Sequence, residues 1–105
     1  MQKKSRKRAS NYFEAVIQLR PRNEELIHFI INQVEQRKDV FISEVKERKT
    51  GFDVYLSSQR FARTLGKKLK DRFKGVLKIT RTLFKKDRQT SKLLYRATVL
   101  FRLKE

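Results

Sequence analysis

In residues 51–74, GFDVYLSSQRFARTLGKKLKDRFK, the spacing of the apolar residues changes once, from every second residue to helical spacing. Apolar and polar residues alternate over the first six positions, which predicts a strand with one buried face. The apolar residues that follow recur at helical spacing, and they are Phe61, Ala62, Leu65, Leu69 and Phe73. Ser57 or Ser58 is a suitable N-cap between the two elements, and Gly75 is suited to close the helix. The stretch therefore predicts a strand followed directly by an amphipathic helix.

The same two periods mark the rest of the chain. Residues 12–20 alternate and predict a strand with Phe13, Ala15, Ile17 and Leu19 on one face. The other predicted elements are a helix over residues 24–38 with Asn23 as its N-cap, two strands over 39–58 around a turn at 49–51, and a closing hairpin with strands over 76–84 and 92–103.

This order, β-α-β-β-α-β-β, is that of a ferredoxin-like split βαβ sandwich with an extra C-terminal strand. The α+β fold places two helices on one face of an antiparallel sheet and leaves the other face open. The expected sheet order is 4-1-3-2, with the fifth strand extending the edge beside strand 4. We expect a single α+β domain over residues 11–105, preceded by a basic disordered arm or linker at residues 1–10.

The composition is strongly basic. The chain has 28 Lys and Arg against 11 Asp and Glu, a formal net charge of +17. Because self-repulsion on this scale opposes folding, we expect a partner that neutralises it, and nucleic acid is favoured over an anionic membrane or an acidic protein. No apolar run approaches the roughly 20 residues of a membrane span. The absence of Cys excludes disulfides, zinc ribbons and thiol nucleophiles and fits a reducing cytoplasm.

Five cations of the second predicted helix fall on the side opposite its apolar stripe, at about 100° per residue. They are Arg60, Arg63, Lys67, Lys70 and Lys74. Asp71 is the only acid in this helix, whereas a face that only solubilises a helix usually interleaves Glu for i,i+4 pairs. The pattern indicates a ridge that binds phosphates, with a plain solvated helix face as the alternative.

The closing hairpin extends this bias. Its cations are Arg81, Lys85, Lys86, Arg88 and Lys92 around the turn, and Arg96 and Arg102 on one face of the last strand. Lys and Arg neutralise phosphates and release counterions, which gives a steep salt dependence and little sequence preference. Lys-rich hairpins also protect an exposed sheet edge from pairing, so this explanation stays open.

Two tyrosines are candidates for stacking on RNA bases. Tyr12 and Tyr55 are expected on neighbouring strands and on the uncovered sheet face, as in an RNA-recognition motif. The segment KTGFDVYL lacks the full signature of that motif, however. An interface or a plain strand position for Tyr55 is therefore the alternative.

Catalytic residues are scarce in this sequence. The sole histidine, His28, flanks the apolar stripe of the first helix and is expected at the surface. The carboxylates show no spacing typical of a two-metal site, and there is no glycine-rich phosphate loop. We therefore expect no enzyme activity, no cofactor, no metal and no small-molecule substrate.

Three stretches together resemble a known family: EAVIQLR (14–20), GFDVYLSSQRFARTLGKKL (51–69) and DRQTSKLLYRATVLFR (87–102). The chain resembles the central region of archaeal members of the large-ribosomal-subunit export adaptor family, also called nonsense-mediated-decay protein three. The resemblance covers residues 12–103 and depends on the order and spacing of the stretches.

The resemblance implies binding to the large ribosomal subunit, through ribosomal RNA and ribosomal proteins, during late maturation in the cytoplasm. Full-length relatives carry an N-terminal zinc-binding region with paired cysteines, which this Cys-free sequence does not contain. The chain is then either a fragment that starts after the zinc region or a shortened homologue. Eukaryotic members also carry a C-terminal export signal that is missing here, so nuclear export is not implied.

The leading hypothesis is a non-catalytic RNA- or ribosome-binding module that uses the basic helix face and the basic hairpin. The alternative is a protein–protein docking domain that receives an acidic partner on its open sheet face or an edge strand. A small RNA-processing enzyme is a third hypothesis.

Overall fold

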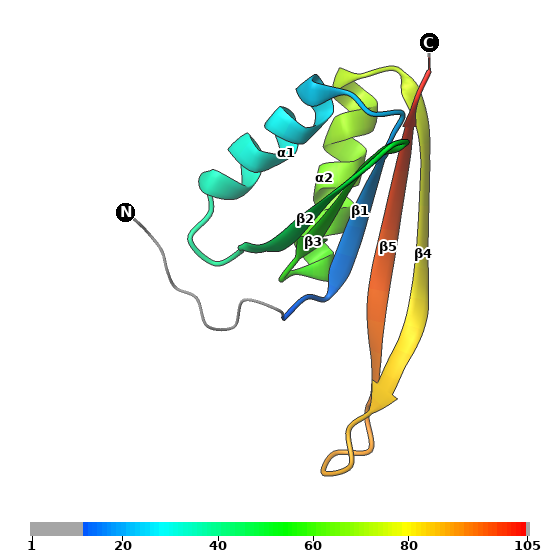
Figure 1. The fold of residues 1–105 in the computed structure, drawn as a ribbon. Coiled ribbons are helices and arrows are strands. Elements are labelled where there is room, and N and C mark those ends of the chain that lie inside the picture. The colour runs from blue at the N-terminus through cyan, green and yellow to red at the C-terminus, as the bar shows by residue number, and fades with distance from the viewer. Residues whose placement is uncertain (1–11, 105) are drawn as a thin grey trace.

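A computed structural model describes residues 12–104 and contains the seven elements in the order expected from the sequence. They are β1 (Ala15–Arg20), α1 (Glu24–Glu35), β2 (Ile42–Arg48), β3 (Gly51–Leu56), α2 (Gln59–Arg72), β4 (Gly75–Lys86) and β5 (Leu93–Leu103). Both helices cover one face of a five-stranded sheet, and the β4–β5 hairpin projects beyond the rest of the domain (Figure 1). The prediction of an α+β fold with two helices on one face is confirmed. The predicted basic arm lies outside the described residues.

The strand order is β2-β3-β1-β5-β4, which corrects the sequence-based expectation. Strand β5 lies between β1 and β4, where the sequence analysis placed strand 4 directly beside strand 1 and strand 5 at the edge. The sheet is also mixed rather than antiparallel, because β1 pairs antiparallel with β3 but parallel with β5. The physical reason is side-chain burial. β5 buries Ala97, Val99 and Phe101, whereas no residue of β4 is fully buried, so the more apolar strand occupies the central position.

Both helices start at the side chains expected to cap them. The Asn23 side chain accepts a hydrogen bond from the backbone N–H of Glu25, and the Ser58 hydroxyl accepts one from Phe61. The helix ends differ from the prediction. α1 ends at Glu35, and α2 ends at Arg72 because Phe73 is already extended. Gly75 is therefore the first residue of β4 and does not close the helix.

The core lies between the helices and the sheet. Alternate residues of the central strands point into it, as the two-residue period predicted. The largest fully buried side chains are Phe101, Ile17, Leu19, Leu26, Ile30, Leu56, Leu65, Leu69, Val54 and Val99. Gly66 lets α2 approach the sheet closely, because a Cβ at this position would lie 2.8 Å from Val99 Cγ1 and 3.0 Å from Leu77 Cδ1.

The β2–β3 hairpin turns at Lys49 and Thr50, followed by Gly51 as the sequence predicted. Gly51 has a φ of 155°, and a Cβ here would lie 1.8 Å from the Leu19 carbonyl oxygen. The turn therefore requires glycine both for its backbone conformation and for the close approach of β1.

Candidate nucleic-acid interface

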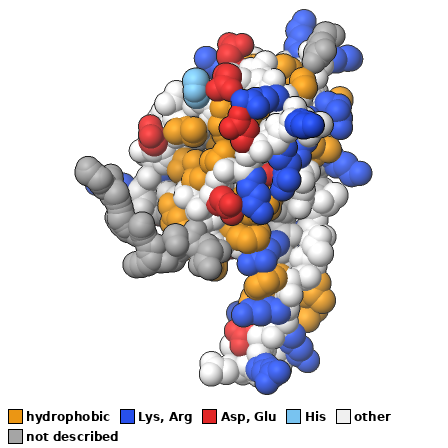
Figure 2. Space-filling model, viewed as in Figure 1, with side chains coloured by type: hydrophobic (Ala, Val, Ile, Leu, Met, Phe, Trp, Pro, Cys, Tyr) orange, Lys and Arg blue, Asp and Glu red, His pale blue; other side chains and the backbone are white. Residues whose placement is uncertain are grey.

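Positive charge is concentrated in one half of the domain. Residues 57–104 hold sixteen basic and two acidic residues, whereas residues 12–56 hold seven basic and eight acidic residues. The basic half forms α2, β5 and β4, which are neighbours at one side of the fold. Lys and Arg side chains accordingly continue along the projecting hairpin (Figure 2). The fold thus turns an uneven charge along the sequence into one basic side of the molecule.

The cations predicted to form the ridge lie on the side of α2 opposite its apolar stripe, away from the sheet. A different flank of the helix reaches α1, where Lys68 Nζ donates to Gln33 Oε1 over 3.0 Å and the Arg72 guanidinium lies 5.5 Å from the Phe29 ring centre. At about 100° per residue, the ridge lies apart from this flank. Arg60, Lys67 and Lys70 are exposed there, Arg63 is half-buried, and Lys74 is exposed just after the helix. The predicted ridge therefore exists on the exposed surface of α2.

The tip of the hairpin forms a second basic group. Lys85, Lys86, Arg88 and Lys92 are all exposed there. The acid among them, Asp87, is used to close the turn. Its side chain accepts from the Gln89 N–H at 2.9 Å, and its backbone N–H donates to the Lys92 carbonyl at 2.7 Å. Asp87 is therefore committed to the turn backbone, and no neighbouring cation forms an ion pair with it among the described residues.

Ion pairs are confined to the other half of the domain. Within residues 12–104, they join Arg20 and Arg48 to Asp53, Arg22 to Glu24 and Glu47, and Arg37 to Asp39. None of the twelve cations predicted to bind nucleic acid belongs to one of these pairs. A cation without an acidic partner keeps its full charge for an anion from outside, so this distribution favours a polyanionic partner.

The strand register divides the predicted cations between two surfaces. Arg81 is paired with Ala97 and lies on the helix side, where its guanidinium is 4.4 Å from the Tyr95 ring centre. Arg96 and Arg102 are paired with Thr82 and Val76 and lie on the open face. The ridge of α2 and Arg102 are therefore on opposite sides of the sheet, and one flat ligand cannot contact both.

Arg96 has a clear structural role. Its guanidinium lies between two rings, 3.8 Å from the centre of Phe13 and 3.5 Å from that of Phe84, and its Nε donates to the Phe13 carbonyl at 3.1 Å. The contact joins the start of β1 to the hairpin across the open face. The assignment of Arg96 to phosphate binding stays a prediction, and this stack is a sufficient reason for an Arg here.

The two tyrosines do not form the pair that the sequence analysis expected. Tyr12 precedes β1, is 48% exposed and donates its hydroxyl hydrogen to Glu14. Tyr55 is on the open face and packs edge-on against Phe13, with ring centres 4.9 Å apart. Phe13 therefore takes the place expected of Tyr12. It does not share the buried face of Ala15, Ile17 and Leu19, because regular strand geometry begins only at Ala15.

Phe84 is the aromatic residue that the sequence analysis missed. The β4–β5 register shifts between Leu83 and Lys85, which leaves Phe84 as the extra residue of a bulge. The two large apolar residues Leu83 and Phe84 in succession interrupt the alternation of β4, and this was the available signal. Because of the bulge, the Phe84 ring meets Arg96 although it is 44% exposed.

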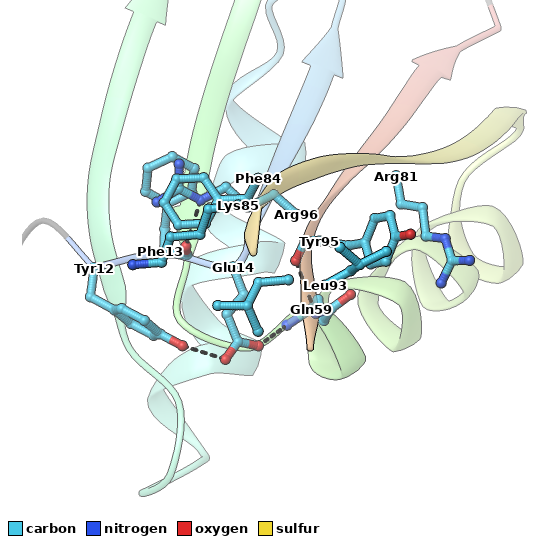
Figure 3. A pocket seen from close by; sticks show the side chains of 11 residues that line it. Tyr12, Phe13, Glu14, Gln59, Arg81, Phe84, Lys85, Leu93, Tyr95 and Arg96 are labelled. Atoms are coloured by element: carbon cyan, nitrogen blue, oxygen red, sulfur yellow. Dashed lines mark hydrogen bonds between the residues drawn. The ribbon is translucent and has the colours of Figure 1, made fainter. Parts of the chain in front are cut away.

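A cleft of about 610 Å³ lies beside this stack (Figure 3). Its walls come from the segment before β1, the first residue of α2 and the base of the hairpin. Glu14 lies inside it, with Oε1 accepting from the backbone N–H of Gln59 at 3.0 Å and the Tyr12 hydroxyl donating to Oε2. The hydrogen bond from Tyr12 to Glu14, together with partial burial, raises the pKa of Tyr12 above its usual value of 10.0.

Residues 12–104 offer little for other kinds of site. No three His, Cys, Asp or Glu residues in this range gather closely enough to hold a metal ion. No helix formed by these residues is both long enough and apolar enough to cross a membrane. His28 is exposed on α1, as expected.

The fold and charges define a small basic α+β domain whose positive charge is concentrated on α2, β4 and β5, with a projecting hairpin. The family model described as "NMD3, second domain" matches residues 12–103, and the chain belongs to this family. The resemblance to the large-subunit export adaptor family is thereby confirmed. No curated protein sequence matches the chain. The family is linked to ribosomal subunit export, so the function of the chain is ribosome-related in this general sense.

Proposed function

We propose that the chain is a non-catalytic module that binds ribosomal RNA of the large subunit in the cytoplasm. The contact surface is the α2 ridge together with the tip of the β4–β5 hairpin. The observation that carries this proposal is the set of exposed cations on these elements that have no acidic partner among residues 12–104. Family membership supports a ribosomal partner, and the unpaired charge supports RNA as the part of the ribosome that is contacted.

Two features of the geometry support phosphate binding. The cations lie on a helix and a hairpin whose backbone is already ordered. Binding therefore costs mainly the rotamer freedom of the Lys and Arg side chains. The hairpin also extends past the sheet, which lets its tip approach a groove or a junction between RNA helices (Figure 1). Each phosphate neutralised releases counterions, so the affinity should fall steeply as salt rises.

A matched pair of charge reversals tests this proposal. The variant with Lys86→Glu and Arg88→Glu changes the hairpin tip, and the variant with Lys38→Glu and Lys49→Glu changes two exposed cations on the other half. Both variants have the same net charge. We expect the hairpin variant to lose at least about tenfold in affinity for large-subunit RNA, and the control to change little. Equal losses in both variants would show that only net charge matters and would refute the hairpin as a contact.

A protein-docking role is the second candidate, and the edge of the sheet favours it. Among the described strands, β4 pairs with β5 alone and therefore lies at the edge of the sheet. Its residue Val76 is 60% exposed. An extended acidic segment can add to such an edge through backbone hydrogen bonds. Competition between an RNA fragment and an acidic peptide for the purified chain separates the two candidates.

A further inference from the structure

The cleft beside the hairpin is more apolar than the basic surface around it. Its walls include Tyr12, Phe84, Leu93 and Leu94, and these residues are 48%, 44%, 50% and 36% exposed. Large apolar side chains that remain exposed next to one another are typical of a binding surface. Its volume of about 610 Å³ is within the range of sites that hold small organic ligands. The cleft is therefore suited to a flat apolar group.

The polar groups of the cleft are of two kinds. Arg81, Lys85 and Arg96 line it and bring positive charge, while Glu14 is the only acidic group among the described residues that line it. Both carboxylate oxygens of Glu14 already accept one hydrogen bond, and each has a further lone pair. A ligand with ring N–H or amino donors and a nearby anionic group would match this arrangement. A nucleotide has both, because its base carries the donors and its phosphate carries the charge.

The rings are placed for stacking. Arg96 covers one face of Phe84, and the exposed fraction of this side chain leaves further ring surface accessible to a ligand. Tyr12 is held toward the cleft by its hydrogen bond to Glu14 (Figure 3). Unpaired RNA bases bind proteins by stacking on aromatic side chains, whereas bases within a duplex cannot reach them. A second copy of the chain is a poor occupant, because two chains with a net charge of +17 repel each other.

We propose that this cleft binds a single unpaired nucleotide of the bound RNA, with the base among Tyr12, Phe84 and the two leucines and its phosphate near Lys85. This inference rests on the proposed RNA-binding function and adds a preference for bulged or looped RNA. The α2 ridge and hairpin tip provide affinity that does not depend on base pairing. The cleft adds selectivity for RNA with an unpaired base.

The test compares two RNA stems that are identical except for one bulged nucleotide. Fluorescence anisotropy measures the affinity of the purified chain for each stem. We expect the bulged stem to bind about five- to 150-fold more tightly, the range for stacking one base on an aromatic side chain. In the Phe84→Ala variant this ratio should fall close to one, while the affinity for the plain stem is retained. A 5-iodouridine at the bulge should crosslink on irradiation to Tyr12 or Phe84.

Two variants serve as controls. Phe41→Ala removes an aromatic side chain that is 39% exposed outside the cleft, and it should keep the full ratio. Leu93→Ser changes a half-exposed wall of the cleft and should lower the ratio, which keeps the test valid if Phe84→Ala fails to fold.

Equal binding of both stems by the unaltered chain would overturn this inference but not the proposed function. Failure to bind either stem in dilute buffer would overturn both. Binding of an acidic peptide that is lost in Phe84→Ala, together with equal binding of the stems, would assign the cleft to a protein instead.

Discussion

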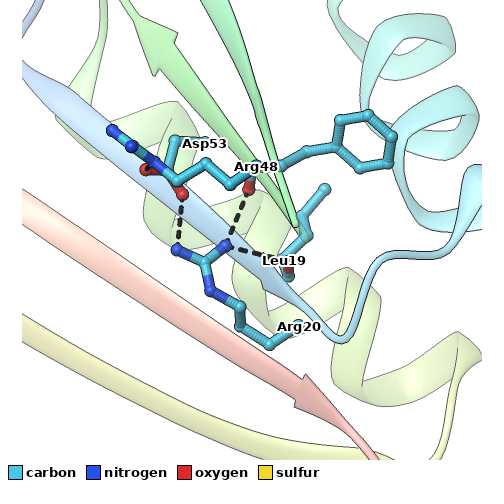
Figure 4. Close-up of polar contacts among 5 residues, drawn as sticks. Leu19, Arg20, Arg48 and Asp53 are labelled. Atoms are coloured by element: carbon cyan, nitrogen blue, oxygen red, sulfur yellow. Dashed lines mark hydrogen bonds and ion pairs between the residues drawn. The ribbon is translucent and has the colours of Figure 1, made fainter. Parts of the chain in front are cut away.

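Arg20 and Asp53 form a nearly buried ion pair between neighbouring strands, with Nη2 of Arg20 2.7 Å from Oδ1 of Asp53 (Figure 4). The second carboxylate oxygen of Asp53 accepts from Nε of Arg48 at 2.6 Å. Arg20 Nη1 also donates to the carbonyls of Leu19 and Phe52, so the guanidinium joins β1 to β3 on the open face. Asp53 is the only buried acid among residues 12–104.

Replacement of Asp53 by Ala should destabilise the fold strongly. The change leaves the Arg20 guanidinium, whose side chain is 15% exposed, without its acidic partner. Breaking a buried ion pair in this way costs about 3 to 5 kcal/mol of unfolding free energy. Urea unfolding followed by circular dichroism measures this. Asp39→Ala removes an exposed partner of Arg37 and should change the free energy of unfolding far less, because solvent screens an exposed ion pair. A similar effect of the two substitutions would contradict the importance of burial.

Truncation of Arg96 to Ala should reduce the stability of the domain, whereas truncation of Arg102 should change it little. Arg96→Ala removes a guanidinium stacked between two rings and should reduce stability by about 1 to 3 kcal/mol. Arg102 is exposed, so Arg102→Ala should change stability by less than about 0.5 kcal/mol. Thermal unfolding of both variants checks this. If Arg96→Ala melts like the unaltered chain, the stack does not stabilise the domain.

Two glycines should differ in their tolerance of Ala. Gly66→Ala places a Cβ 2.8 Å from the buried Val99 side chain, and the cost of overpacking, about 1 to 3 kcal/mol, is partly offset by better helix propensity. Gly51→Ala instead meets a backbone oxygen at 1.8 Å, which cannot move without shifting β1. We expect a larger loss of unfolding free energy for Gly51→Ala in urea titrations. The reverse order would show that the turn adapts more easily than the core.

The Tyr12–Glu14 hydrogen bond should be visible in the titration of the tyrosines. It stabilises the protonated phenol and raises the pKa of Tyr12, so its contribution to stability is complete below pH 10 and is lost as the pH rises through the pKa of the folded state. Glu14→Gln should lower the pKa of Tyr12 toward its ordinary value. NMR of ring-labelled tyrosine measures this, and Tyr12→Phe identifies the signal. An unchanged pKa in Glu14→Gln would exclude this carboxylate as the cause.

The α2 ridge should contribute to the salt dependence of RNA binding. Lys67→Gln together with Lys70→Gln should reduce the slope of log affinity against log salt by about 0.7 to 0.9 for each phosphate that these lysines neutralise in the unaltered chain. The matched control is Lys38→Gln with Lys49→Gln, which should keep the original slope. Binding titrations at several salt concentrations provide both values. A slope that is equal in the two variants would place the RNA elsewhere on the domain.

Much of the candidate site could be predicted from the sequence, because it depends on local spacing. The helical period put Arg60, Lys67 and Lys70 on one exposed flank, and the hairpin tip was recognised from its turn residues. The aromatic stack of Phe13, Arg96 and Phe84 could not be predicted. It depends on a one-residue bulge at Phe84 and on where β1 begins, and both are settled by contacts between strands far apart in the sequence.

The sequence by itself determined the seven elements, both helix N-caps, most of their buried faces and the excess of positive charge. These properties depend on residues within a few positions of one another. Only the tertiary structure decided that β5 lies between β1 and β4, that the predicted cations divide between two surfaces, and that a cleft opens at the base of the hairpin. The order of the strands results from competition between β4 and β5 for the centre of the sheet. The strand that buries more apolar surface takes that place, and this comparison involves the whole core rather than any one segment.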